Sequence, residues 1–264
     1  MIHTAPDGCR IHYDTAGTAG PRVLLIPGLG GDSRFWTGVA GDLGRDHRLI
    51  LADHRGAGRS DRPDSAYSIP QIAADMAAIL RETGGRAHVV GHSTGGAIAQ
   101  VLTLDHADLV ASVTISASWA RADARFAAMF RARAAMIEAG LAEAYQELTP
   151  VLGHEPDYLA DRAGDLARAV AAAPRTLAPF TVTARRVRML LDHDRLTDLP
   201  RIAVPALILA ASQDEMTPPP MQQQIANAIP GARLVRLPGA HFHPVAHPDR
   251  LSAAVRDFLA GLAP

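Results

Sequence analysis

The stretch Val89-Val90-Gly91-His92-Ser93-Thr94-Gly95-Gly96-Ala97-Ile98-Ala99 links a short β-branched run to an alanine-rich helical pattern through Gly-x-Ser-x-Gly. The order predicts a strand, a tight turn and a helix. Glycine suits positions 91 and 95 because a side chain there would collide with neighbouring backbone in so sharp a turn. A serine just before a helix also lies near free N–H groups. The stretch predicts a nucleophilic Ser93, and a plain helix-capping serine is the alternative.

Apolar runs and helical patterns alternate on both sides of this turn. The runs are apolar throughout, as in strands that a parallel sheet buries on both faces. We expect strands at 2–16 (a hairpin turning at 6–8), 23–26, 48–52, 86–91, 110–116, 204–210 and 232–237. We expect helices at 36–43, from 69 to the glycines at 84 and 85, and at 94–107, 221–228 and 248–262. The fold class is therefore α/β, a mostly parallel sheet of about eight strands flanked by helices.

One long interval lacks any strand pattern. Between Trp119 and Leu199 the residues follow Ala/Arg/Leu helical patterns that are too apolar for a disordered linker. We expect residues 119–199 to form a helical cap inserted into a core made of residues 1–118 and 200–264. Such a cap would cover the edge of the sheet at which ligand chemistry takes place in α/β proteins.

Composition excludes several classes of function. The formal net charge is −1, so the chain lacks the excess of basic residues that is typical of nucleic-acid-binding proteins. No run approaches the 18 apolar residues that a membrane span needs. All 26 basic residues are Arg, so a phosphate-binding loop with its Lys and a pyridoxal Schiff base are both excluded. The single Cys9 has no partner for a disulfide. We expect a cytoplasmic protein with no cofactor, no metal and no membrane or nucleic-acid partner.

A serine nucleophile needs a base, and the base needs an acid that orients it. Asp214 and His241 both follow expected strands, so they reach the same sheet edge as Ser93. The chain order Ser, Asp, His is typical of this kind of turn. Two alternatives remain at this point. Asp214 could be a turn former with Glu215 as the acid, and His241, His243 and His247 could bind a metal.

With these residues in place, the chain resembles the α/β-hydrolase fold family over residues 10–262. The matching pieces are the loop 28–31, Asp53-x-Arg55-Gly56-x-Gly58-x-Ser60, the turn at Ser93, the Asp214 loop, and His241 before a helix begun by Pro248. The resemblance implies that Ser93 is the nucleophile, His241 the base and Asp214 the acid. It also implies an oxyanion hole formed by the backbone N–H groups of Leu29 and Thr94.

A narrower resemblance is to the small serine hydrolases around 3-oxoadipate enol-lactonase and the aminoacrylate hydrolase of pyrimidine breakdown. It rests on Gly28-Leu29-Gly30-Gly31 with Trp36, on Tyr67-Ser68-Ile69, and on Trp119. The chain departs from the group's pattern at two positions. Pro27 stands where many members have His, and Ala246 stands where many have Glu. The second difference removes a contact that would support the histidine loop.

Substrate contacts must come from the glycine loop and the cap. We expect them from Gly28, Trp119, Phe126, Met129 and Phe180, although most apolar residues of the cap belong between its helices. Arginine binds carboxylates through a planar fork, so a clamp for an anionic substrate is a further hypothesis. Its candidates are Arg121, Arg125, Arg185, Arg186 and Arg188.

The predicted reaction is hydrolysis of a small carboxylic ester or lactone through an acyl-enzyme. Serine instead of aspartate at the turn argues against opening of haloalkanes or epoxides. The same three residues could also cleave a C–C, amide or carbamate bond, and a cofactor-free perhydrolase or a non-hydrolytic small-molecule receptor on this fold are further alternatives. Two points are left open, namely whether the substrate carries a carboxylate and whether the protein forms a homodimer.

Overall fold

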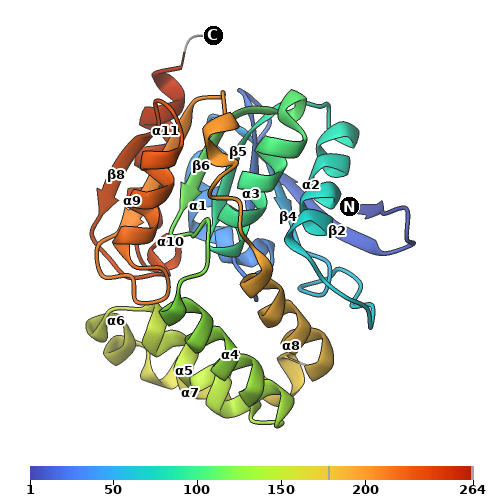
Figure 1. Cartoon of the computed structure of the whole chain (residues 1–264), viewed down its shortest axis with the longest axis vertical. Helices are drawn as coiled ribbons and strands as arrows, with labels where there is room; N and C mark the ends of the chain where they lie inside the picture. Colours follow the sequence, from blue (N-terminus) through green and yellow to red (C-terminus); the bar gives the residue numbers. More distant parts are fainter. Residues whose placement is uncertain (178, 263–264) are drawn as a thin grey trace.

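A single sheet with helices on both faces forms the centre of the computed structural model, which describes residues 1–177 and 179–262 (Figure 1). The strands are β1 (Ile2–Thr4), β2 (Arg10–Ala16), β3 (Arg22–Ile26), β4 (Arg48–Ala52), β5 (Ala87–His92), β6 (Val110–Ser116), β7 (Ala206–Ala211) and β8 (Arg233–Leu237). They are ordered β1-β2-β4-β3-β5-β6-β7-β8. Pairing is antiparallel for β1 with β2 and for β2 with β4, and parallel across the rest. The predicted fold class is confirmed.

Helices follow most strands, as the alternating pattern predicted. They are α1 (Thr37–Leu43), α2 (Ile69–Glu82), α3 (Thr94–Asp105), α4 (Ala124–Glu138), α5 (Ala142–Gly153), α6 (Pro156–Asp161), α7 (Ala163–Thr176), α8 (Phe180–Arg188), α9 (Pro219–Ala228), α10 (His243–Ala246) and α11 (Pro248–Ala260). The short α10 and four 3-10 turns were not expected from the sequence, because elements of three or four residues carry no periodicity. None of the described helices has the length and hydropathy needed to cross a bilayer.

The strands are apolar on both faces because each face carries its own hydrophobic core. In β3, Leu24 and Ile26 join the larger core, which also contains side chains of α2, α3 and α9. The alternate residues Val23 and Leu25 join the smaller core against α1 and α11. Successive side chains of a strand point to opposite faces, so an unbroken apolar run is what such a sheet requires.

The register brings the carboxyl ends of the central strands level with one another. Ile26 of β3 pairs with Gly91 of β5, and His92 pairs with Ser116 of β6. Ser116 in turn pairs with Leu209 of β7. The loops that follow these strands therefore meet at one edge of the sheet, where the chemistry was predicted.

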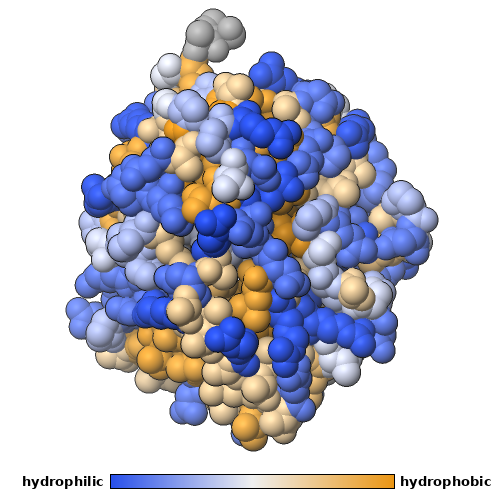
Figure 2. All heavy atoms as spheres, viewed as in Figure 1, coloured by the Kyte–Doolittle hydropathy of each residue, from blue (hydrophilic) through white to orange (hydrophobic). Residues whose placement is uncertain are grey.

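The interval 119–199, here the helical segment, contains α4 to α8 and no β-strand among its described residues. Figure 1 shows these helices gathered at one end of the molecule. An isolated bridge and an ion pair (Nε to Oδ2, 2.8 Å) between Arg121 and Asp194 join the two ends of the segment. Figure 2 shows apolar surface at this end of the molecule. Two apolar side chains of the helical segment, Leu141 and Val151, are 54% and 59% exposed. The division into a core and a cap stays a prediction.

Candidate active site

Ser93 lies on a strained turn between β5 and α3. Its φ of 54° and ψ of −118° fall in a region that non-glycine residues rarely adopt. Two hydrogen bonds from neighbouring segments stabilise this backbone conformation. Ser93 N–H donates to Ser116 O (2.8 Å), and Ser118 Oγ donates to Ser93 O (2.8 Å). A Cβ at Gly91 would lie 2.1 Å from the carbonyl oxygen of Gly95. Glycine at position 91 therefore avoids the collision with neighbouring backbone that the sequence predicted for this turn.

The structure brings Ser93, His241 and Asp214 together in one hydrogen-bonded line. His241 Nε2 lies 3.0 Å from Ser93 Oγ, and His241 Nδ1 lies 2.8 Å from Asp214 Oδ2. Asp214 follows β7, His241 follows β8, and both are 2% exposed. Asp214 also accepts from the N–H groups of Met216 and Thr217 and from Thr217 Oγ1, at 2.8–2.9 Å. Three donors from its own loop, together with His241 Nδ1, fix the orientation of this buried carboxylate.

The three histidines of the metal alternative have separate partners. His243 Nε2 contacts Ser116 Oγ (2.9 Å) and His247 Nε2 contacts Glu155 Oε1 (3.1 Å), whereas His241 faces Ser93. Burial, together with His241 nearby, lowers the pKa of His243 to about 3. No group of three or more His, Cys, Asp or Glu side chains suited to a metal occurs in the part of the chain that the structure describes. The other acid candidate, Glu215, is exposed and paired with Arg125.

The loop after β3 is anchored beside Ser93. Leu29 and Thr94 both line the cavity that Ser93 faces, and Thr94 is the first residue of α3, whose N–H has no acceptor within the helix. The buried Asp53 holds the loop by accepting from the N–H of Ser33 (2.7 Å) and the N–H of Arg59 (2.9 Å).

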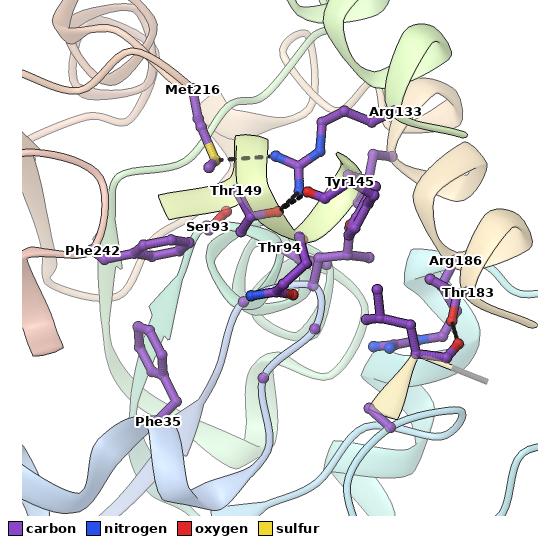
Figure 3. A pocket seen from close by; sticks show the side chains of 18 of the residues that line it. Phe35, Ser93, Thr94, Arg133, Tyr145, Thr149, Thr183, Arg186, Met216 and Phe242 are labelled. Atoms are coloured by element: carbon purple, nitrogen blue, oxygen red, sulfur yellow. Dashed lines mark hydrogen bonds between the residues drawn. The ribbon is translucent and has the colours of Figure 1, made fainter. Parts of the chain in front are cut away.

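A cavity of about 380 Å³ opens above Ser93, within the size range of small-molecule sites (Figure 3). Gly28 lines it, as expected. The other four expected contacts do not: Trp119 and Phe126 are 1% exposed and pack on each other (4.6 Å between ring centroids), and Met129 and Phe180 pack against the core. The helical side of the cavity is instead formed by Phe130, Arg133, Tyr145, Gln146, Thr149, His154, Thr176, Leu177, Thr183, Arg186 and Leu190.

The helical segment also supports the His241 loop, which the sequence did not reveal. Phe242 N–H donates to Gly153 O (2.7 Å), and a Cβ at Gly153 would lie 2.2 Å from the Phe242 ring. Glu155 accepts from the Ala240 N–H and from His247. Ala246 stands where the resemblance led us to expect Glu, and Glu155 brings a carboxylate to the His241 loop from the helical segment.

Four of the five candidate clamp arginines form ion pairs at the protein surface. Arg121 pairs with Asp194, Arg125 with Glu215, Arg185 with Asp64 and Arg188 with Glu138. The fifth, Arg186, is buried and lines the cavity.

A mostly parallel sheet with a strained serine turn at its carboxyl edge defines the class of α/β hydrolases. A family model described as alpha/beta hydrolase fold matches residues 21–245, and the chain belongs to this family. It is a hydrolase.

Several similar proteins belong to a narrower set of hydrolases within this family. The chain is 35% identical over 245 residues to a protein named as the carbamate hydrolase RutD of Azorhizobium caulinodans, covering 90% of this chain and 91% of that one. Among solved structures it is similar to a hydrolase from Pseudomonas aeruginosa (27% identity, TM-score 0.88, covering 99% and 98% of the two chains). It is also similar to the enol-lactonase from Burkholderia xenovorans (25% identity, TM-score 0.90, covering 98% and 100%). These neighbours fit the narrower resemblance seen in the sequence.

Proposed function

We propose that the protein hydrolyses a small carboxylic ester or lactone through an acyl-enzyme on Ser93. The observation that carries the proposal is the hydrogen-bonded line from Asp214 through His241 to Ser93 Oγ, which ends at the cavity. A serine hydroxyl becomes a useful nucleophile only beside an oriented base. The segment 119–199 acts as a cap over this centre.

In the first half-reaction, His241 Nε2 takes the hydroxyl proton while Ser93 Oγ attacks the scissile carbonyl. The negative charge that develops on the carbonyl oxygen is held by the N–H groups of Leu29 and Thr94. His241 then gives the proton to the departing alkoxide, which leaves as an alcohol or, from a lactone, stays attached through the acyl chain. In the second half-reaction, His241 takes a proton from water, the water attacks the acyl-enzyme, and Ser93 recovers its proton.

Carbamate hydrolysis by the same residues is the second candidate, because relatives that share about a third of their sequence with this chain are named carbamate hydrolases. The nitrogen of a carbamate donates electron density into the carbonyl, so a carbamoyl group on Ser93 resists attack by water. With p-nitrophenyl N-methylcarbamate, an ester hydrolase releases one burst of nitrophenol for each active site. A carbamate hydrolase releases it continuously.

The main test is chemical labelling of Ser93. A fluorophosphonate probe should modify Ser93, and turnover of p-nitrophenyl acetate should fall by about 10⁴-fold or more in Ser93→Ala. Circular dichroism of the variant controls for folding. Absence of labelling in the folded wild-type protein would overturn the proposal.

Two further outcomes separate the non-hydrolytic alternatives. Labelling without turnover of any ester or lactone in a graded panel would indicate a receptor. Activity that appears only with peroxide would indicate a perhydrolase.

A further inference from the structure

The hydroxyl of Thr94 lies at the cavity without a hydrogen-bond partner. Thr94 follows Ser93 directly, lines the cavity, and is labelled with Ser93 in Figure 3. The residue is fully buried, and its Oγ1 makes no hydrogen bond within residues 1–177 and 179–262. Among the described residues that line the cavity, no other buried side-chain oxygen lacks a partner. The hydroxyl next to the nucleophile is thus the one that the protein leaves unpaired.

The position of Thr94 at the start of α3 explains why no helical group pairs with it. Inside a helix, a threonine hydroxyl can donate to the carbonyl oxygen four residues earlier. Thr103 of the same helix does so, and its Oγ1 donates to Ala99 O (2.7 Å). Four residues before Thr94 the chain is still in strand β5, so no helical carbonyl lies at that position. Thr94 also cannot cap the helix, because Ser93 occupies the N-cap position.

Other hydroxyls around Ser93 do have partners. Ser118 Oγ donates to the carbonyl oxygen of Ser93, and Ser116 Oγ contacts a buried histidine. Thr217 Oγ1 donates to the carboxylate that orients the base. A buried hydroxyl without a partner destabilises the folded chain, because it has given up its hydrogen bonds to water. An unpaired hydroxyl at position 94 is therefore suited to a ligand that supplies an acceptor.

The oxygen of a tetrahedral intermediate is the acceptor that fits this position. The backbone N–H of Thr94 is one of the two donors expected to hold that oxygen. Backbone N and Oγ1 of one threonine are joined through only Cα and Cβ, so both can donate to a single oxygen. The intermediate is bonded to Ser93 Oγ, which brings its oxygen closer to Thr94 than a molecule that merely fills the cavity. A hydroxyl closed off from solvent can therefore act once this bond forms.

We propose that Thr94 Oγ1 is a third donor of the oxyanion hole, in addition to the backbone N–H groups of Leu29 and Thr94. The inference rests on the proposed function and adds a catalytic residue to it. The hydroxyl keeps its proton and donates a hydrogen bond while negative charge resides on the carbonyl oxygen. The charge returns to the carbonyl bond as the leaving group departs. A donor that acts on this developing charge more than on the uncharged substrate raises kcat.

The first test removes the hydroxyl and keeps the backbone donor. Thr94→Val preserves the shape of the side chain, and both kcat and kcat/KM for p-nitrophenyl acetate should fall by about 10- to 100-fold. Thr94→Ser keeps a hydroxyl and should retain most of the activity. The matched control is Thr103→Val, which removes a buried hydroxyl from the same helix and should leave kcat unchanged. Full kcat in Thr94→Val, or equal losses in Thr94→Val and Thr94→Ser, would overturn the proposal.

A transition-state analogue separates contact with the oxyanion from contact with the substrate. A trifluoromethyl ketone adds reversibly to a serine hydroxyl and forms a tetrahedral oxyanion, whereas the matching methyl ketone binds largely without addition. In Thr94→Val, the inhibition constant of the trifluoromethyl ketone should rise by the factor by which kcat/KM falls. The inhibition constant of the methyl ketone should stay the same. Equal weakening of both ketones would show that the hydroxyl binds the uncharged ligand, and the assignment to the oxyanion would be wrong.

Thermal stability distinguishes a catalytic hydroxyl from a structural one. Because Oγ1 has no partner in the described chain, Thr94→Val should melt at the same or a higher temperature than the wild-type protein. A lower melting temperature with unchanged affinity for the trifluoromethyl ketone would show that the hydroxyl supports the fold, against the proposal.

Labelling of Ser93 separates this inference from the proposed function. If the fluorophosphonate probe labels the wild-type protein and Thr94→Val turns over esters at the full rate, the hydrolase stands and the third donor is refuted. If the folded wild-type protein is not labelled, both the proposed function and the third donor are refuted.

Discussion

The hydroxyl of Thr217 donates to Asp214 Oδ2, the same oxygen that lies 2.8 Å from His241 Nδ1. The Thr217 N–H donates to the other oxygen, Oδ1 (2.8 Å), so one residue contacts both oxygens of the carboxylate. Thr217 is fully buried and Asp214 is 2% exposed. The carboxylate that orients His241 is therefore itself oriented by its own loop.

Thr217→Val removes one of these donors and keeps the shape of the side chain. Asp214 then lacks one hydrogen bond to Oδ2, so the carboxylate is less firmly positioned against His241. We expect kcat to fall by about fivefold to 20-fold, as for loss of one hydrogen bond to a charged group. Thr217→Ser should restore kcat, and an unchanged kcat in Thr217→Val would show that the hydroxyl has no influence on the base.

Asp53 connects the loop that carries Leu29 to the Arg59 loop, although it lies far from Ser93 in the sequence. Asp53→Asn replaces one accepting oxygen with an NH₂ group, which then faces the N–H of Ser33 or of Arg59. We expect a kcat about 10- to 100-fold lower, since a displaced loop loses an oxyanion donor, together with a lower melting temperature. Asp64→Asn, at an exposed ion pair, is the control. Full activity in Asp53→Asn would show that the loop does not need this anchor.

Most of the fold could be predicted because its signals are local and repeated. Apolar runs such as Leu24–Ile26 are buried on both faces, and the helix expected from residue 69 to the glycines at 84 and 85 is α2 (Ile69–Glu82). These features follow from hydrophobic periodicity and from the glycines that end the helix. The positions of Ser93, Asp214 and His241 could also be predicted, because the carboxyl ends of parallel strands meet at one edge.

The residues that line the cavity could not be predicted from the same signals. Periodicity indicates which face of a helix is apolar, but both the neighbouring helices and the cavity select apolar residues. Trp119 and Phe126 therefore carry the same signal as Phe130, which does line the cavity. Arg133 was missed because a buried arginine is indistinguishable in sequence from an exposed one such as Arg131. Only the packing of α4 against α5 and α8 separates the two positions.

Gly95 and Gly41 both lie in helices, so intrinsic helix propensity alone favours alanine at both. A Cβ at Gly95 would lie 2.1 Å from Ile26 O and 2.6 Å from Pro27 O, whereas one at Gly41 has no atom within 4 Å. We expect Gly95→Ala to lower the free energy of unfolding by about 1–3 kcal/mol or more, because backbone must shift. Gly41→Ala should raise it by about 0.5–1 kcal/mol. Urea denaturation measures both, and stabilisation by Gly95→Ala would contradict the close approach of α3 to β3.

Stability should fall in mild acid because several histidines are buried in the neutral form. His193 is 4% exposed, lies 3.3 Å from Gln100 Oε1, and has its pKa lowered by burial to about 4 from an ordinary 6.5. Between these values the unfolded chain binds a proton that the folded chain does not, so stability present above pH 6.5 is lost as the pH falls toward 4. The free energy of unfolding from urea titrations at pH 7, 6, 5 and 4.5 should decline less steeply in His193→Gln than in the wild-type protein. Equal slopes in the two proteins would show that His193 takes up its proton as readily in the folded chain as in the unfolded one.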